Sequence, residues 1–120
     1  MTDIIRNPGN PRLSRSVVHN GIVYLTGTST LEGNDIKSQT RDVLRKIDGY
    51  LAAAGSDKTR LLQAQIWLKD IKRDFAGMNA VWTEWVDPAH LPARATCQAE
   101  LAEEGELIEV IVIATTTNRT

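Results

Sequence analysis

The sequence has 120 residues, enough for one domain with a substantial hydrophobic core, and we expect residues 1–120 to form that single domain. Its 14 Lys and Arg residues nearly balance its 15 Asp and Glu residues, which argues against nucleic-acid binding through a basic field and against a polybasic membrane anchor. A single cysteine excludes an intrachain disulfide, and the lack of a signal pattern or of a long apolar run predicts a cytoplasmic protein.

The N-terminal quarter of the sequence predicts a β-hairpin. Residues 16–19 and 22–26 are rich in β-branched and apolar types, and the Asn-Gly pair between them favours a tight turn because both residues tolerate positive φ. Residues 7–12 are rich in Pro and Gly and predict an irregular loop after a short first strand. The small and polar residues 27–33 predict a second loop.

The next segment predicts a helix that Asn34 caps at its start and Gly55 caps at its end. Its buried face is predicted from residues spaced three or four apart, which are Ile36, Thr40, Val43, Ile47 and Leu51. Charged residues occupy the other faces, as is typical of a helix that packs on a core with one side.

The second half of the sequence predicts three strands and one helix. Residues 61–68 alternate between apolar and polar types, which indicates a strand with one face in the core. Residues 72–86 predict a helix whose core positions are Phe75, Met78, Trp82 and Trp85. Residues 92–101 and 107–114 predict the last two strands, and the final one is apolar enough to be central.

These elements follow the order β-β-β-α-β-α-β-β, which predicts an α+β domain with a six-stranded sheet. Two helices can cover one face of such a sheet but not both. The other face therefore needs a partner, and a second copy of the same chain is the simplest one.

Two charged residues stand out as candidates for chemistry. Glu109 lies within the apolar last strand, where a carboxylate costs several kcal/mol unless it is paired, hydrogen-bonded or protonated. It could form an ion pair that closes the sheet or an oligomer interface, or it could belong to a functional site. Arg94 follows Pro-Ala at the start of a strand, where its planar guanidinium suits a carboxylate, although a solvent-exposed arginine is the simpler interpretation.

Other polar motifs carry little signal. His19 and His90 lack the spacing of metal ligands, and residues 26–30 lack the glycines and lysine of a phosphate-binding loop. We interpret Cys97 as buried packing rather than as a nucleophile.

Several segments resemble, in the same order, those of one known family. They are residues 12–27, 39–48, 54–56, 75–82, 92–96 and 108–114. Pro-Ala-Arg-Ala-Thr at 92–96, followed by Ile-Glu-Val-Ile-Val-Ile-Ala, resembles the C-terminal signature of the Rid (YjgF) family of reactive-intermediate deaminases.

The resemblance implies a chorismate-mutase-like fold, with a mixed six-stranded sheet, two helices on one face, and a homotrimer with three sites in clefts between subunits. It implies hydrolysis of 2-imino acids, formed from enamines such as 2-aminoacrylate, to 2-oxo acids and ammonia. It also implies that no metal and no cofactor is needed. The expected partners are a small carboxylate substrate and further copies of the chain, without nucleic acid or membrane.

The same resemblance assigns roles to individual residues. Arg94 is expected to hold the substrate carboxylate, and Glu109 is expected to be tied to the attacking water. The other positions expected to bind substrate are Thr26, Gly27, Asn79 and Thr96. The sequence departs from the family at Leu13, Thr26 and Thr96, where tyrosine, serine and cysteine are frequent, and these changes leave the preferred imino acid open.

Two alternatives belong to other functional classes. The same cleft could serve a non-catalytic trimer that binds small carboxylic acids or a metabolic partner. RNA cleavage or translation inhibition, which has been attached to some relatives, has little support here because the chain lacks a basic stripe and its aromatic residues are expected on a core face.

Overall fold

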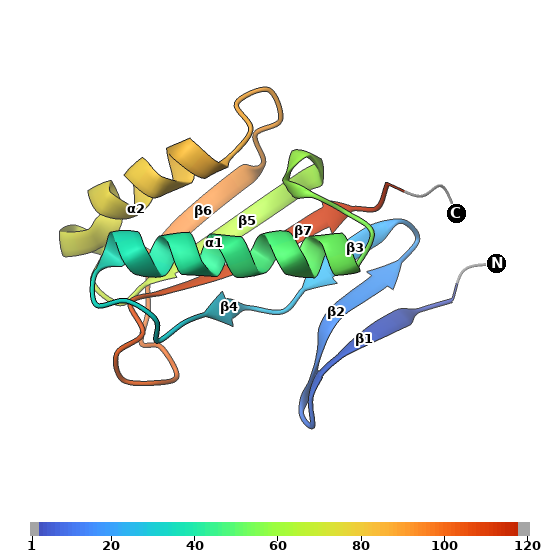
Figure 1. The fold of residues 1–120 in the computed structure, drawn as a ribbon, viewed down its shortest axis with the longest axis horizontal. Helices are drawn as coiled ribbons and strands as arrows, with labels where there is room; N and C mark the ends of the chain where they lie inside the picture. The colour runs from blue at the N-terminus through green and yellow to red at the C-terminus, as the bar shows by residue number, and fades with distance from the viewer. Residues whose placement is uncertain (1–2, 118–120) are drawn as a thin grey trace.

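A mixed β-sheet and two helices on one of its faces form two layers (Figure 1). The structure is a computed structural model that describes residues 3–117. In chain order the elements are β1 (Ile5–Asn10), β2 (Leu13–His19), β3 (Ile22–Leu25), β4 (Thr28–Ser29), α1 (Ile36–Ala53), the 3₁₀ turn η1 (Lys58–Arg60), β5 (Leu61–Leu68), α2 (Ile71–Trp85), β6 (Ala93–Gln98) and β7 (Ile108–Thr115). The predicted α+β class with both helices on one face is confirmed.

The C-terminal strand lies in the middle of the sheet. The strand order is β1-β2-β3-β7-β5-β6, and β4 pairs with β7 next to β3. β5 and β6 run parallel, as their connection through α2 requires, whereas β7 is antiparallel to its neighbours β3, β4 and β5. The predicted central position of the last strand is confirmed, and β6 is left as an edge strand.

Two loop predictions are wrong because tertiary pairing recruits the residues into the sheet. Residues 27–33 contain β4, in which Thr28 pairs with Val110 and Ser29 pairs with Glu109. Residues 7–12 also do not form an irregular loop, since β1 continues to Asn10 and pairs with β2 through two register shifts. An edge strand with such irregularities tolerates proline, which cannot donate a ladder hydrogen bond. The sheet therefore has seven strands among residues 3–117 instead of the predicted six.

The first helix is the one predicted, with its caps moved by one residue. Asp35, not Asn34, is the N-cap, and its Oδ1 accepts a 2.8 Å hydrogen bond from the Ser38 N–H. Ala54, not Gly55, is the C-cap, and Gly55 follows it with a φ of 80°. The N–H of Ser56 reaches back to the carbonyl of Leu51, which completes a Schellman motif. All five residues of the predicted apolar face are buried.

The second helix packs with a slightly different face from the one predicted. Met78 and Trp82 are buried and Trp85 is half-buried, but Phe75 is 41% exposed, so its assignment to the core is wrong. Asp74, one residue earlier, takes the buried place on that turn, and its carboxylate accepts hydrogen bonds from Arg73. Within residues 3–117, neither helix is long and apolar enough to cross a membrane.

The core lies between the helices and one face of the sheet. Alternate residues of β7 enter it, namely Ile108, Val110, Val112 and Ala114, while the residues between them are only half-buried. On the helix-free face, β3 adds Tyr24, which is 47% exposed. One chain thus leaves this face uncovered, and the homotrimer remains an expectation.

Candidate functional site

The two principal candidate residues lie on opposite faces of the sheet. Glu109 alternates with core residues of β7 and therefore belongs to the helix-free face. Arg94 on β6 pairs in register with Ala64 of β5, which pairs with Val112 of β7, and both of these residues are in the core. Arg94 therefore belongs to the helix-covered face, so one chain holds the two residues apart.

Glu109 is packed directly on the backbone of Gly27. A Cβ added at Gly27 would lie 2.2 Å from Oε2 of Glu109, which is closer than any real contact. Gly27 is needed here for space, since its φ is not in the left-handed region. The half-buried Thr26 precedes it and donates its N–H to the carbonyl of Arg15 at 2.9 Å. The structure thus brings Gly27 to Glu109 and places Thr26 next to it in the chain.

The carboxylate of Glu109 has no hydrogen bond or ion pair with any residue in the range 3–117 that the structure describes. Burial raises the pKa of Glu109, and the charge of Glu106 raises it further. An ion pair inside the chain, one of the interpretations left open by the sequence, is therefore not present in this part of the molecule. The group is placed to take up and release a proton closer to neutral pH than an ordinary glutamate.

Glu106 is a neighbour of this site that the sequence did not reveal. Its side chain is buried, and its two carboxylate oxygens accept hydrogen bonds from Ser29 Oγ at 2.6 Å and from the Glu103 N–H at 3.0 Å. The sequence places Glu106 in a turn rich in glutamate, where an exposed side chain is the normal expectation. Only the pairing of β4 with β7 reveals the contact, because it brings Ser29 beside Glu109.

Arg94 lies over the indole ring of Trp82 on α2, with 5.4 Å from its guanidinium carbon to the ring centroid. Burial lowers the pKa of Arg94 from its ordinary value, but an arginine remains a cation in proteins. Among residues 3–117, no carboxylate lies within ion-pair distance of Arg94. A cation with a stacked aromatic ring and no anionic partner is suited to binding an anion from outside the chain.

Two further predicted residues lie on the same side as Arg94. Thr96 is two residues further along β6 and pairs with the buried Ile66, and its Oγ1 is buried without a hydrogen-bond partner in the described chain. Asn79 is half-buried on α2, three residues before Trp82 and therefore on a neighbouring part of the helix surface. The six predicted residues thus form two groups, with Arg94, Thr96 and Asn79 in one and Thr26, Gly27 and Glu109 in the other.

The prediction that Cys97 is buried is wrong. Cys97 is exposed, because β6 is an edge strand and its side chain points to the helix-free face. On that face Trp67 of β5 pairs with both Cys97 and Glu109, so a row of side chains runs across the sheet from Cys97 through Trp67 and Glu109 to Ser29. Within residues 3–117, no three His, Cys, Asp or Glu side chains are grouped so that they could hold a metal ion.

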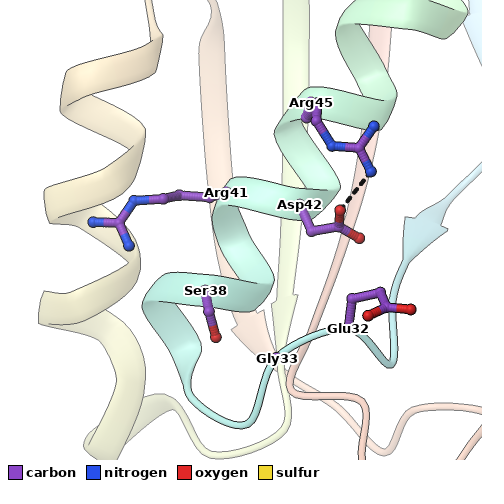
Figure 2. A pocket seen from close by; sticks show the side chains of 6 residues that line it. All are labelled: Glu32, Gly33, Ser38, Arg41, Asp42 and Arg45. Carbon is purple, nitrogen blue, oxygen red and sulfur yellow. Dashed lines mark hydrogen bonds and ion pairs between the residues drawn. The ribbon is translucent and has the colours of Figure 1, made fainter.

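A surface hollow of about 380 Å³ beside the start of α1 contains none of the predicted residues. Figure 2 shows its lining, which is Glu32, Gly33, Ser38, Arg41, Asp42 and Arg45. Asp42 accepts hydrogen bonds from Thr30 at 2.6 Å and from Arg45 at 2.6 Å, and both bonds lower the pKa of its carboxyl. These contacts fix the loop between β4 and α1, so we assign this hollow a structural role.

Comparisons with known proteins agree with this fold. The family model described as "Endoribonuclease L-PSP" matches residues 7–116. A RutC family protein from Haemophilus influenzae is 44% identical over 107 residues, covering 87% of this chain and 90% of that protein. The RutC family protein YoaB from Escherichia coli strain K12 is 39% identical over 111 residues, covering 92% and 96% of the two chains.

The crystal structure of a YjgF family member from Neisseria meningitidis superposes with a TM-score of 0.93 at 40% sequence identity, covering 97% of both chains. The matched range extends from β1 to β7 and includes both groups of candidate residues. The chain belongs to the Rid (YjgF) family, the family that its motifs resemble.

Proposed function

We propose that the protein hydrolyses reactive 2-imino acids, such as those that arise from 2-aminoacrylate, to 2-oxo acids and ammonia. The observation that carries the proposal is the presence of two complementary groups that are unpaired within the described chain. Arg94 is a cation without an anionic partner, and Glu109 is a half-buried carboxylate with a raised pKa. The first suits the carboxylate of a 2-imino acid, and the second suits proton transfer to and from water.

We propose that each site forms between two copies of the chain. Arg94 and Glu109 point to opposite faces, so a substrate that touches both is best held by Arg94 of one copy and Glu109 of another. The helix-free face supports such an assembly, because Ile111 and Ile113 of β7 are only half-buried there. The family resemblance implies a homotrimer with intersubunit sites, and this geometry agrees with that arrangement.

In this mechanism Arg94 binds the substrate carboxylate with two parallel hydrogen bonds and thereby orients the protonated imine. Glu109 accepts a proton from a water molecule as the water oxygen attacks the imine carbon, and the C=N π electrons move to nitrogen. Protonated Glu109 then gives that proton to the amino nitrogen of the tetrahedral adduct. The C–N bond breaks and ammonia leaves, while the hydroxyl group gives its proton to the Glu109 carboxylate as the C=O bond forms, and Glu109 then releases that proton to solvent.

The test is an imine-hydrolysis assay. Imino acids are generated in place from several amino acids by an oxidase or a lyase, and oxo-acid release is followed with wild type, with Arg94→Ala and with buffer alone. We expect faster release with wild type only, and the ranking of amino acids gives the preferred side chain. Equal rates in all three samples would reject the proposal.

The Arg94 group also favours a second candidate function, a non-catalytic protein that binds small carboxylic acids. Arg94 and the unpartnered Thr96 Oγ1 can bind a carboxylate without help from Glu109. This protein would bind 2-oxo acids in calorimetry, lose binding in Arg94→Ala, and show no turnover. We propose no role in RNA cleavage despite the description of the family model, because the balanced charge offers no basic field.

A further inference from the structure

Glu106 and Glu109 are two acidic side chains that the fold holds close together, and the family resemblance gave a role only to the second. We propose that Glu106 is a positioning residue for the proposed hydrolysis: bound to Ser29, which pairs with Glu109, its buried carboxylate places a second negative charge beside the residue that accepts the proton from water. This inference rests on the proposed function, because it concerns the strength of the base in that reaction.

The position of Glu106 is fixed at both oxygens. The carboxylate is 7% exposed and accepts hydrogen bonds from Ser29 Oγ and from the Glu103 N–H. Ser29 is also the residue of β4 that pairs with Glu109 of β7. A two-residue strand therefore links the two glutamates, and Glu106 acts as an acceptor in both bonds, as a carboxylate anion does.

The turn that carries Glu106 is fastened to α1 on both sides of it. Gln39 of α1 is buried, and its Nε2 donates to the carbonyl of Gly105 at 2.8 Å and to that of Gly33 at 3.0 Å. Its Oε1 accepts a hydrogen bond from the Leu107 N–H at 2.8 Å. These bonds fix the backbone on either side of Glu106, and its side chain can leave only by breaking its bonds to Ser29 and Glu103.

The negative charges of Glu106 and Glu109 are not neutralised by an ion pair within residues 3–117. Among residues 3–117, neither Glu106 nor Glu109 forms an ion pair. Lys46 of α1 donates to the carbonyl of Ser29 at 3.3 Å, but its ammonium lies 3.6 Å from Asp42.

From the β5 and β6 side, Lys69 pairs with Glu100, and Cys97 lies one strand beyond Trp67 in the row that continues through Glu109 to Ser29. Neither lysine forms an ion pair with Glu106 or Glu109. The direction of the effect on Glu109 follows, since the charge of Glu106 adds to burial in raising the pKa of Glu109.

A higher proton affinity of Glu109 suits both proton transfers, the one from water and the one to the amino nitrogen. A carboxylate that titrates nearer to neutral pH removes a proton from water more effectively. Once protonated, it still returns that proton to the amino nitrogen, which is far more basic. Glu106 thereby adjusts Glu109 to its task without contacting the substrate.

The test compares Glu106→Gln with Glu104→Gln. Each variant removes one negative charge from the same turn, but Glu104 is exposed and, within residues 3–117, forms no hydrogen bond or ion pair through its side chain. The Glu109 side-chain carbon is followed by NMR during a pH titration, and its signal is assigned by its loss in Glu109→Gln. We expect the midpoint of Glu109 to fall in Glu106→Gln and to stay unchanged in Glu104→Gln. A midpoint that does not move in Glu106→Gln would overturn the inference.

Activity supplies a second readout. In Glu106→Gln the acidic limb of the kcat profile, where Glu109 becomes protonated, should move to lower pH, and kcat at pH 7 should fall by about three- to tenfold. A purely structural role would lower activity without moving that limb. If Glu106→Gln does not fold, Ser29→Ala replaces it, and a Glu109 midpoint unchanged in Ser29→Ala would then overturn the inference.

Different results would overturn the proposed function and the role of Glu106. Absence of imine hydrolysis in wild type overturns the proposed function whatever the titration shows. An active wild type whose Glu109 midpoint is the same with and without the Glu106 charge overturns only the role of Glu106.

Discussion

The two faces of the sheet differ in how completely a single chain covers them. On the helix-covered face, the apolar residues of β3, β5 and β7 are closed off by α1 and α2, and this face supplies the core. On the helix-free face, alternate residues of β7 stay half-buried and include a carboxylate. Folding of one chain covers the first face and leaves the second uncovered, and we propose that a further copy of the chain covers the second face.

The division of charge between the faces has a chemical consequence. If Arg94 and Glu109 faced each other in one chain, they would form an ion pair and neutralise each other before any substrate arrived. Within one chain the sheet prevents this pairing, because Arg94 lies on the helix-covered face and Glu109 on the helix-free face. A site that uses both groups therefore needs two copies of the chain, as we propose.

Loss of the cation is expected to have the largest effect on the proposed activity. Arg94→Ala should lower kcat/KM by about a hundred- to several-thousand-fold, because losing one partner of a desolvated charge pair costs about 3–5 kcal/mol. Stability should change little, since the stacking of Arg94 on Trp82 is worth about 0.5–1 kcal/mol. Kinetics and thermal unfolding of the same samples check both statements, and an unfolded variant would contradict them.

Loss of the Glu109 carboxylate should lower turnover without changing the oligomeric state. Glu109→Gln keeps the size of the side chain and is expected to lower kcat by about a hundredfold or more, as removal of a general base does. We expect its sedimentation profile to remain that of wild type. A monomeric or unfolded Glu109→Gln protein would show instead that Glu109 holds the oligomer together.

Mixing these two variants tests whether one site draws on both faces. Refolded together in equal amounts, Arg94→Ala and Glu109→Gln chains can meet so that an intact Glu109 faces an intact Arg94. Random mixing restores roughly a quarter of the sites if the two residues come from different copies, and activity should return to about that level. Activity that stays at the level of the separate variants would assign both residues to the same copy.

Much of the fold could be predicted because the patterns are local. The helix over 36–53 was predictable from its spacing of apolar residues, and the β2–β3 hairpin from its Asn-Gly turn. The strand β4 could not be predicted, since two residues have no periodicity and pair only because β7 lies next to them. The exposure of Cys97 was missed for a similar reason, since it depends on β6 being an edge strand.

The site shows the same limit. Arg94 and Glu109 could be singled out as candidates, one from a motif and one from a charge in an apolar strand. Their separation could not be predicted, because it requires the register of β5 against both β6 and β7. Glu106 was missed because its partner Ser29 is 77 residues away in the chain.

The close contact between Gly27 and Glu109 allows a milder test, in which Glu109 is displaced but not replaced. In Gly27→Ala the new methyl group must displace the Glu109 carboxylate, which is the end of a flexible side chain, so stability should be nearly unchanged. A displacement of about 1 Å can cost on the order of a hundredfold in rate, so we expect kcat to fall by about ten- to a hundredfold.

Gly49→Ala is the matched control for that change. Nothing lies within 4 Å of a Cβ at Gly49 on α1, so this variant should keep full activity and gain about 0.5–1 kcal/mol of stability. Full activity in Gly27→Ala would mean that the carboxylate does not need its present position.

The smallest expected effect is the contribution of Glu109 to the pH dependence of stability. Because the folded state raises the pKa of Glu109, it binds this proton more tightly than the unfolded chain does, and stability falls as pH rises from the unfolded pKa to the folded one. Glu109→Gln lacks this penalty. It should match wild type near pH 4 and exceed it at pH 7 by no more than about 1 kcal/mol, because the half-exposed position is screened by solvent. Thermal unfolding at several pH values and one protein concentration measures the difference, and a stability difference that does not grow with pH would show that folding leaves the proton affinity of Glu109 unchanged.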